Sequence, residues 1–245
     1  MEYTGMTLAF ALRGTNGLVL GADSRVSSTE GTADTSTKVL QVNREVGVLT
    51  YGLAEVGYKA ITRLVDEANR TSDFTGVKKK RIVHFSEIAE NAENIFKATF
   101  DEWINRVKRD NPNLQPNDPG ILTGFILGGF DLNETNQFKI LAWQSPDFKA
   151  QERPDIIAAQ WAISQYLIHH LYYSEMNVDQ LKRLAVFLLV ETEMISTCVG
   201  GPFQIATITL ETGFQKLGEK DIQVLINENQ SRFANLRRVF LDKLG

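Results

Sequence analysis

The chain has 245 residues, of which 43% are hydrophobic and 23% charged, with a formal net charge of −4. A chain of this size can bury a large core without disulfide or metal staples. The single cysteine, Cys198, excludes an internal disulfide and suits a reducing compartment. The slightly acidic charge argues against a nucleic-acid-binding protein, which usually carries a basic face.

The N-terminus lacks the features of a secretion signal, because residues 1–6 contain no basic segment followed by a long apolar run. No apolar run of the sequence is long enough to span a bilayer. We therefore expect a cytoplasmic protein that does not use a membrane.

Short apolar runs separated by turn residues predict strands in the first part of the chain. Asn16-Gly17 favours a hairpin turn, since this pair readily supplies positive φ. The polar stretch 24–37 predicts a loop or a short polar hairpin. Four strands are expected here, at residues 7–13, 17–23, 38–42 and 47–51.

The apolar spacing then changes to that of helices. A helix is expected over residues 54–69 and a second one from an N-cap at Ser86 to about Val107. The Pro-rich segment 111–119 ends this pattern. The remaining elements are expected as strands at 121–130 and 138–143, helices at 159–173 and 178–194, strands at 204–210 and near 221–225, and a helix at 228–243.

No linker divides this order, so a single domain is expected over residues 7–245. Groups of strands separated by pairs of helices suggest an α+β fold with helix layers outside two stacked sheets around one core.

The segment 7–25, TLAFALRGTNGLVLGADSR, resembles the N-terminus of mature proteasome β-type subunits, which are N-terminal-nucleophile (Ntn) hydrolases. In that family a catalytic threonine opens a strand that turns at a glycine and returns through an apolar strand to an aspartate. With Thr7 as the threonine, Gly17 and Asp23 fall in register without gaps. The resemblance implies a bacterial- or archaeal-like proteasome homologue with a four-layer α-β-β-α sandwich of mainly antiparallel sheets.

Later segments extend the resemblance over most of the chain. Lys38 matches the family's catalytic lysine, with about one residue missing from the preceding loop. The run TYGLA at 50–54 resembles the segment whose glycine N–H forms the oxyanion hole, which gives that role to Gly52. The run VGGPFQIAT at 199–207 resembles the Gly-Gly start of a late strand.

The implied chemistry is that of a threonine peptidase. A threonine hydroxyl is a poor nucleophile and needs a base, and a freed α-amino group, with a pKa of about 7.7–8.0, can take its proton. The ammonium of Lys38 would lower the pKa of that amine, and Asp23 would hold Lys38. The N–H of Gly52 would stabilise the oxyanion by about 3 kcal/mol.

The chain departs from the family at the residues that support this machinery. The family places a serine in a turn before the third helix, where this chain has AAQWA at 158–162. It also places an aspartate and a serine just before the Gly-Gly pair, where only Ser196 or Thr197 could substitute. Arg25 is a further supporting residue, expected to form an ion pair with Asp23.

Catalysis requires Thr7 to be N-terminal, so residues 1–6 would be a propeptide that the chain removes by autoprocessing. A second register places Gly5 at the nucleophile position, with a two-residue insertion at the Gly14 turn, and predicts a subunit without a nucleophile. The two functional hypotheses are thus an active threonine peptidase and an inactive structural subunit. An Ntn hydrolase acting on a non-peptide amide is a third.

The sequence indicates no metal or cofactor site. His169 and His170 are adjacent and point about 100° apart on a helix, which makes a poor metal pair, and no phosphate-binding glycine motif is present. The resemblance implies a polypeptide substrate, self-assembly into a ring or other homo-oligomer, and an unfoldase or other proteasome-like subunits as further partners.

Overall fold

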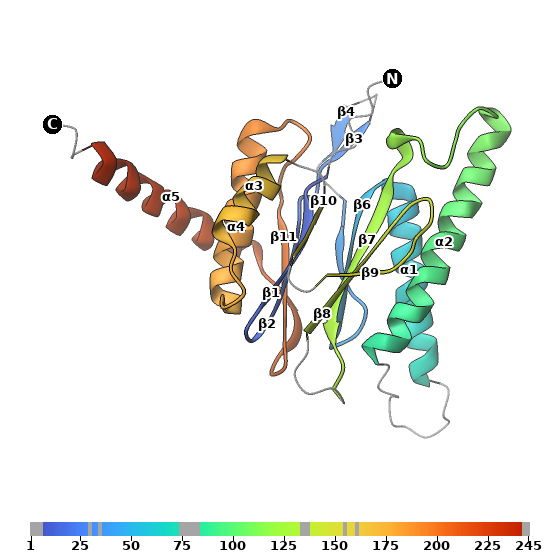
Figure 1. Cartoon of the computed structure of the whole chain (residues 1–245), viewed down its shortest axis with the longest axis horizontal. Helices are drawn as coiled ribbons and strands as arrows, with labels where there is room; N and C mark the ends of the chain where they lie inside the picture. The colour runs from blue at the N-terminus through green and yellow to red at the C-terminus, as the bar shows by residue number, and fades with distance from the viewer. Residues whose placement is uncertain are drawn as a thin grey trace.

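The computed structural model describes residues 7–28, 31–33, 36–73, 84–132, 138–153, 156–159 and 162–241. The predicted propeptide, residues 1–6, lies outside them. The described part forms four layers, in which two stacked sheets lie between two layers of helices (Figure 1). The predicted α+β fold, a four-layer α-β-β-α sandwich with antiparallel sheets, is confirmed.

Each of the two large sheets has five antiparallel strands. The first sheet contains, in spatial order, β10 (Ile156–Ala159), β1 (Ala9–Gly14), β2 (Gly17–Ala22), β11 (Gln204–Thr209) and β12 (Gly213–Lys216). The second contains β5 (Val39–Gln41), β6 (Val46–Gly52), β7 (Thr123–Phe130), β8 (Phe138–Gln144) and β9 (Gln151–Arg153). A separate small hairpin consists of β3 (Val26–Ser28) and β4 (Gly31–Ala33).

The helices form the two outer layers of the sandwich. The second sheet is covered by α1 (Ala54–Asp73) and α2 (Phe85–Asp110), and the first by α3 (Ala162–Leu171) and α4 (Val178–Ile195). The last helix, α5 (Glu219–Leu241), packs against α4 and then extends away from the layers (Figure 1). A short 3-10 helix (Pro119–Ile121) precedes β7. No helix of the described residues is long and apolar enough to cross a bilayer.

Three apolar clusters fill the spaces between the four layers. Successive side chains of a strand point to opposite faces of its sheet. Along β1, Phe10 and Leu12 therefore pack toward α4, whereas Ala9 and Ala11 pack between the two sheets. Both faces of the strand are buried, which explains why its sequence is apolar without alternation.

The main error of the sequence prediction lies near the C-terminus. The strand expected near 221–225 is wrong, because these residues belong to α5, which begins at Glu219 rather than near 228. The strand that follows β11 is instead β12, and Gly213, with φ of +67°, allows the turn between them. Ile222 packs into the apolar cluster between the first sheet and α4. A short apolar run fits a strand or a buried helix turn equally well.

Two helix starts also differ from the prediction. The α2 helix begins at Phe85 after an N-cap at His84 that makes no side-chain cap, so Ser86 lies in the first turn. The α3 helix begins at Ala162 rather than Ala159, because Ala159 pairs with Ala9 and extends the first sheet at its edge.

The β1–β2 hairpin is present, and Gly14 pairs with Gly17 across a two-residue turn. The reason given for it from the sequence is wrong, because the described residues with positive φ are Phe148, Gly52 and Gly213. Asn16 instead accepts a hydrogen bond from the N–H of Val178 through its side-chain oxygen, at 2.9 Å. The turn is thereby fixed to the start of α4.

Candidate active site

The candidate site lies where strand ends of both sheets meet. In the first sheet, Ala22 at the end of β2 pairs with Ala9 at the start of β1 and with Gln204 at the start of β11. In the second sheet, Gly52 at the end of β6 pairs with Thr123 at the start of β7. Polar residues that precede or follow these strand ends can therefore meet between the sheets.

Thr7, Asp23 and Lys38 come together at this point. Thr7 precedes β1, Asp23 follows β2 and Lys38 precedes β5. The Lys38 Nζ donates hydrogen bonds to Thr7 Oγ1 at 3.1 Å, to Asp23 Oδ1 at 2.9 Å and to the backbone oxygen of Arg25 at 2.7 Å. All three residues are buried, with whole-residue exposed fractions of 7% for Thr7, 0% for Asp23 and 4% for Lys38.

The hydroxyl of Thr7 faces Lys38 because of its position in the strand pattern. Ala9 and Ala11 of β1 point between the two sheets. Thr7 is two residues before Ala9 and continues the same face, since side chains two residues apart share a face. The sequence thus directs a threonine toward the other sheet, from which Lys38 comes.

Asp23 binds several donors at once. Its Oδ1 accepts from the N–H of Leu8 at 3.1 Å as well as from Lys38, and its Oδ2 accepts from the N–H of Arg25 at 3.0 Å. Burial raises the pKa of the Asp23 carboxyl above its usual value, while Lys38 and the N–H groups of Arg25 and Gly200 oppose the rise. Asp23 therefore links the start of β1 to Lys38.

Gly52 has a backbone conformation that requires glycine. Its φ is +87°, and a Cβ there would lie 1.9 Å from the carbonyl oxygen of Leu122. The N–H of Thr50 donates to the carbonyl of Lys38 at 3.2 Å, so Gly52 lies about 7 Å further along β6 from that contact. No hydrogen bond among the described residues joins Gly52 to Thr7, and its role at the oxyanion stays a prediction.

Arg25 fastens a second segment to the site. The ion pair expected with Asp23 is replaced by a hydrogen bond from the Arg25 backbone N–H. The guanidinium donates instead to the carbonyls of Thr197 at 3.0 Å and Val199 at 3.1 Å. The guanidinium lies over Gly200, where a Cβ would come within 2.3 Å of it. The segment that follows α4 is thereby held against the Asp23–Lys38 pair.

Ser196 is the C-cap of α4, and its hydrogen bonds join it to residues close by in the chain. Its N–H donates to the carbonyl of Thr192 at 3.0 Å, and its Oγ accepts from the N–H of Cys198 at 3.1 Å. Within the described parts of the chain, no hydrogen bond joins Ser196 to Thr7 or Lys38. Its supporting role stays a prediction.

The sequence reasoning missed Gln204, which contacts the backbone around Lys38. Its Oε1 accepts from the N–H groups of Lys38 at 3.0 Å and Val39 at 3.1 Å, and its Nε2 donates to the carbonyl of Ser36 at 2.6 Å. A sequence signal existed, because Gln204 is a polar residue at the start of an apolar strand. Its face is the one that Ala206 and Ile208 present to the other sheet.

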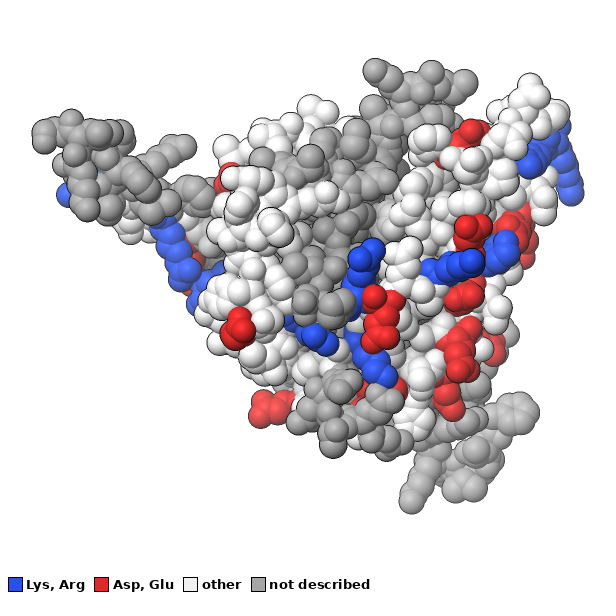
Figure 2. All heavy atoms as spheres, viewed as in Figure 1, with Lys and Arg blue, Asp and Glu red and all other residues white. Residues whose placement is uncertain are grey.

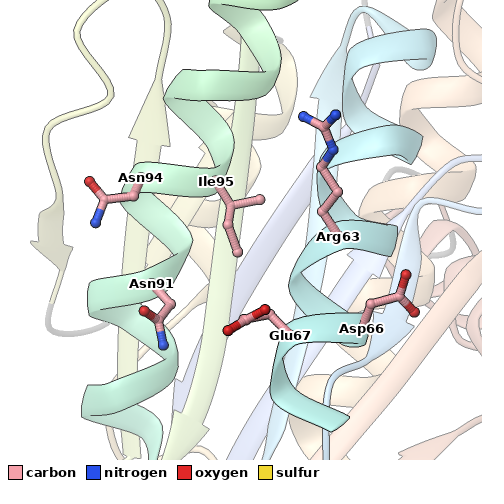
Figure 3. A pocket seen from close by; sticks show the side chains of 6 residues that line it. All are labelled: Arg63, Asp66, Glu67, Asn91, Asn94 and Ile95. Carbon is pink, nitrogen blue, oxygen red and sulfur yellow. The ribbon is translucent and has the colours of Figure 1, made fainter. Parts of the chain in front are cut away.

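A hollow between α1 and α2 is a separate feature. Figure 3 shows its lining, in which Arg63, Asp66 and Glu67 come from α1 and Asn91, Asn94 and Ile95 from α2. These helices cover the outer side of the second sheet, so that sheet separates the hollow from Thr7. Among the described residues, no group of three or more His, Cys, Asp or Glu could hold a metal ion.

Comparisons with known proteins give a partial family match and a likeness in fold. Residues 3–91 match the family model of the proteasome subunit. Anbu (ancestral β-subunit) from Yersinia bercovieri is similar in structure, with a TM-score of 0.71, 16% sequence identity and coverage of 96% of both chains. A mutant of Anbu from Hyphomicrobium sp. strain MC1 has a TM-score of 0.67, 15% identity and the same 96% coverage of each chain. Sequence comparison with curated proteins gives no match.

Proposed function

We propose that this proteasome-type subunit is a threonine peptidase, in which Thr7 becomes the N-terminal nucleophile once residues 1–6 are removed. The observation that carries the proposal is the hydrogen bond from Lys38 Nζ to Thr7 Oγ1 at 3.1 Å, made while Lys38 also binds Asp23. This contact supports the register in which Thr7, rather than Gly5, takes the nucleophile position. Gly5 itself lies outside the described residues.

The proposed reaction uses the freed α-amino group of Thr7 as its base. The amine takes the proton of the Thr7 hydroxyl while Oγ1 attacks the carbonyl carbon of the peptide bond. The proton then passes to the leaving nitrogen as the C–N bond breaks, which leaves an acyl ester on Thr7. A water molecule gives a proton to the amine and attacks the ester, and this step releases the acid and restores the hydroxyl.

Lys38 would favour this reaction in two ways. Its ammonium lies next to Oγ1 and stabilises negative charge that develops there. The same positive charge lowers the pKa of the neighbouring amine, so that more of it is in the neutral form that accepts a proton. Asp23 and the carbonyl of Arg25 hold the ammonium in place, and the N–H of Gly52 would bind the oxyanion.

Intact mass measurement of the natively expressed protein tests the proposal directly. We expect a chain that begins at Thr7 and hydrolyses a fluorogenic peptide, and that forms a single adduct on Thr7 with an epoxyketone or a β-lactone. Thr7→Ala should retain residues 1–6, hydrolyse no peptide and form no adduct. Thr7→Ser keeps a hydroxyl and should retain measurable hydrolysis. A protein that cleaves peptides with Met1 still attached would contradict the proposal.

A non-catalytic structural subunit is the second candidate. The observation that favours it is that the Oγ of Ser196 accepts a hydrogen bond from the N–H of Cys198 rather than contacting Thr7. In the proteasome family the corresponding serine supports the nucleophile. This candidate predicts normal assembly, no adduct with either electrophile and no effect of Thr7→Ala on any activity.

Both candidates include assembly of the chain into a ring or other homo-oligomer, and the first adds a polypeptide substrate and an unfoldase as partners. The mass of the particle in solution, measured by light scattering after gel filtration, tests assembly separately from catalysis. A monomer at micromolar concentration would contradict the assembly that both candidates include.

A further inference from the structure

Gln204 crosses from one sheet to the other at the candidate site. It is the first residue of β11 in the first sheet, and its side chain reaches the residues that lead into β5 of the second sheet. It is buried, with an exposed fraction of 7%. Its side-chain oxygen accepts from two consecutive N–H groups, those of Lys38 and Val39, and its amide nitrogen donates to the carbonyl of Ser36.

These contacts use both the acceptor and the donor side of the glutamine amide. The oxygen of the amide faces two donors and the nitrogen faces an acceptor, so the orientation of the group is fixed by its neighbours. A carboxylate would place an oxygen against the Ser36 carbonyl, and an asparagine would be one methylene too short. A hydrophobic residue would leave the N–H groups of Lys38 and Val39 without this acceptor in a buried position.

We infer that Gln204 is a positioning residue, which fixes the backbone of Lys38 so that its ammonium lies between Thr7 and Asp23. A lysine side chain has a flexible four-carbon stem, so the place of its Nζ depends on where its backbone is held. The backbone of Lys38 is held on one side by the N–H of Thr50 at 3.2 Å and on the other by Gln204. The inference rests on the proposed function for the role of the ammonium, but the clamp itself is independent of catalysis.

The test compares Gln204→Leu with Gln180→Leu. Gln180 forms the capping box of α4, in which its side chain accepts from the N–H of Asn177 at 2.9 Å. Both variants therefore lose glutamine hydrogen bonds to backbone groups, but only one loses them at Lys38. Peptide hydrolysis is measured as kcat, KM and a pH profile, and amide hydrogen exchange is followed in the peptide that contains residues 36–42.

We expect kcat of Gln204→Leu to fall by about 100-fold with little change in KM, since a small displacement of a catalytic group has this effect. The acid-side inflection of kcat/KM should move to higher pH, because a displaced ammonium lowers the pKa of the Thr7 amine less. Exchange in the 36–42 peptide should become faster. Gln180→Leu should leave kcat, the pH profile and this exchange as they are in the unaltered protein.

Gln204→Glu keeps an acceptor for Lys38 and Val39 and should show an intermediate loss of kcat, which keeps the test decisive if Gln204→Leu fails to fold. Unchanged kcat, pH profile and exchange in a folded Gln204 variant would overturn the inference. If the unaltered protein hydrolyses no peptide, the proposed function fails, and exchange in the 36–42 peptide then decides whether Gln204 holds the Lys38 backbone.

Discussion

Two charge clusters of nearly the same geometry lie in different surroundings. Between the sheets, Lys38 pairs with Asp23 at 2.9 Å, and the exposed fractions of the two side chains are 5% and 0%. On the outer helices, Glu102 pairs with Lys59 at 2.8 Å and with Arg63 at 2.9 Å, and all three side chains are between 38% and 51% exposed. Figure 2 shows acidic and basic side chains side by side on the surface over α2, at the right of the view.

The different surroundings shift the pKa values of the Asp23 and Glu102 carboxyls in opposite directions. Burial raises the pKa of Asp23, although Lys38 opposes this rise. The hydrogen bonds from Arg63 and Lys59 lower the pKa of Glu102 from 4.5 to about 2, since that carboxyl keeps its contact with water. The distance between the charged atoms therefore does not by itself determine how much an ion pair contributes to stability. A buried pair is costly to break, whereas an exposed pair contributes little.

Loss of Lys38 should have the largest effect. In Lys38→Met an unbranched apolar chain replaces the lysine stem but Asp23 remains buried without its cation, so we expect a loss of about 3–5 kcal/mol in the free energy of unfolding. Peptide hydrolysis should disappear as well. Lys59→Met is the matched control and should leave both quantities close to their original values. Denaturant unfolding and a peptide assay measure the two, and equal destabilisation by both variants would remove the contrast between the clusters.

The coupling between Lys38 and Asp23 should be the next largest effect. In Asp23→Asn either orientation of the amide places an NH₂ group against an N–H of Leu8 or Arg25, so this variant is destabilised as well. The double variant Lys38→Met with Asp23→Asn buries no unpaired charge. It should therefore be more stable than the sum of the single losses predicts, by about 1–3 kcal/mol. Strict additivity in a denaturant-based double-mutant cycle would contradict a coupled pair.

The sequence predicted the layered fold well because its strands are buried on both faces or paired by a tight turn. It failed at residues 219–226, where four apolar residues fit a strand or a helix, and at β9 and β10, which are only three and four residues long. Propensity and spacing carry little information over three or four residues.

For the site, the sequence named residues but not their contacts. Resemblance singled out Thr7, Asp23 and Lys38, whose meeting depends on pairing between segments far apart in the chain. The clamp by Gln204 joins residues 165 and 166 positions apart, and no local pattern predicts such a contact. The same holds for Arg25, whose guanidinium binds carbonyls of the segment after α4.

The opposite pKa shifts can be measured directly by NMR titration of the side-chain carboxyls. Asp23 should titrate above its usual value of 3.8, and Glu102 below its usual value of 4.5. Because the folded state then binds more protons at Asp23, the stability contributed by this group is present at low pH and falls as pH rises above 3.8. For Glu102 the pH dependence has the opposite sign, because its lowered pKa makes its contribution to stability present above pH 4.5 and lost as pH falls. Asp23 titrating below 3.8 would mean that Lys38 and the N–H donors outweigh burial.

The smallest effect is expected for Glu102→Gln. Its partners Lys59 and Arg63 stay hydrated after the change, so the midpoint of thermal unfolding should hardly move at neutral pH. Any difference from the unaltered protein should be present above pH 4.5 and shrink as pH falls toward 2, because protonation of Glu102 removes the same charge. It should also shrink in 1 M salt, where the Debye length is about 3 Å. A large, salt-independent loss would show that this cluster behaves like the buried one, and exposure would then not be what separates them.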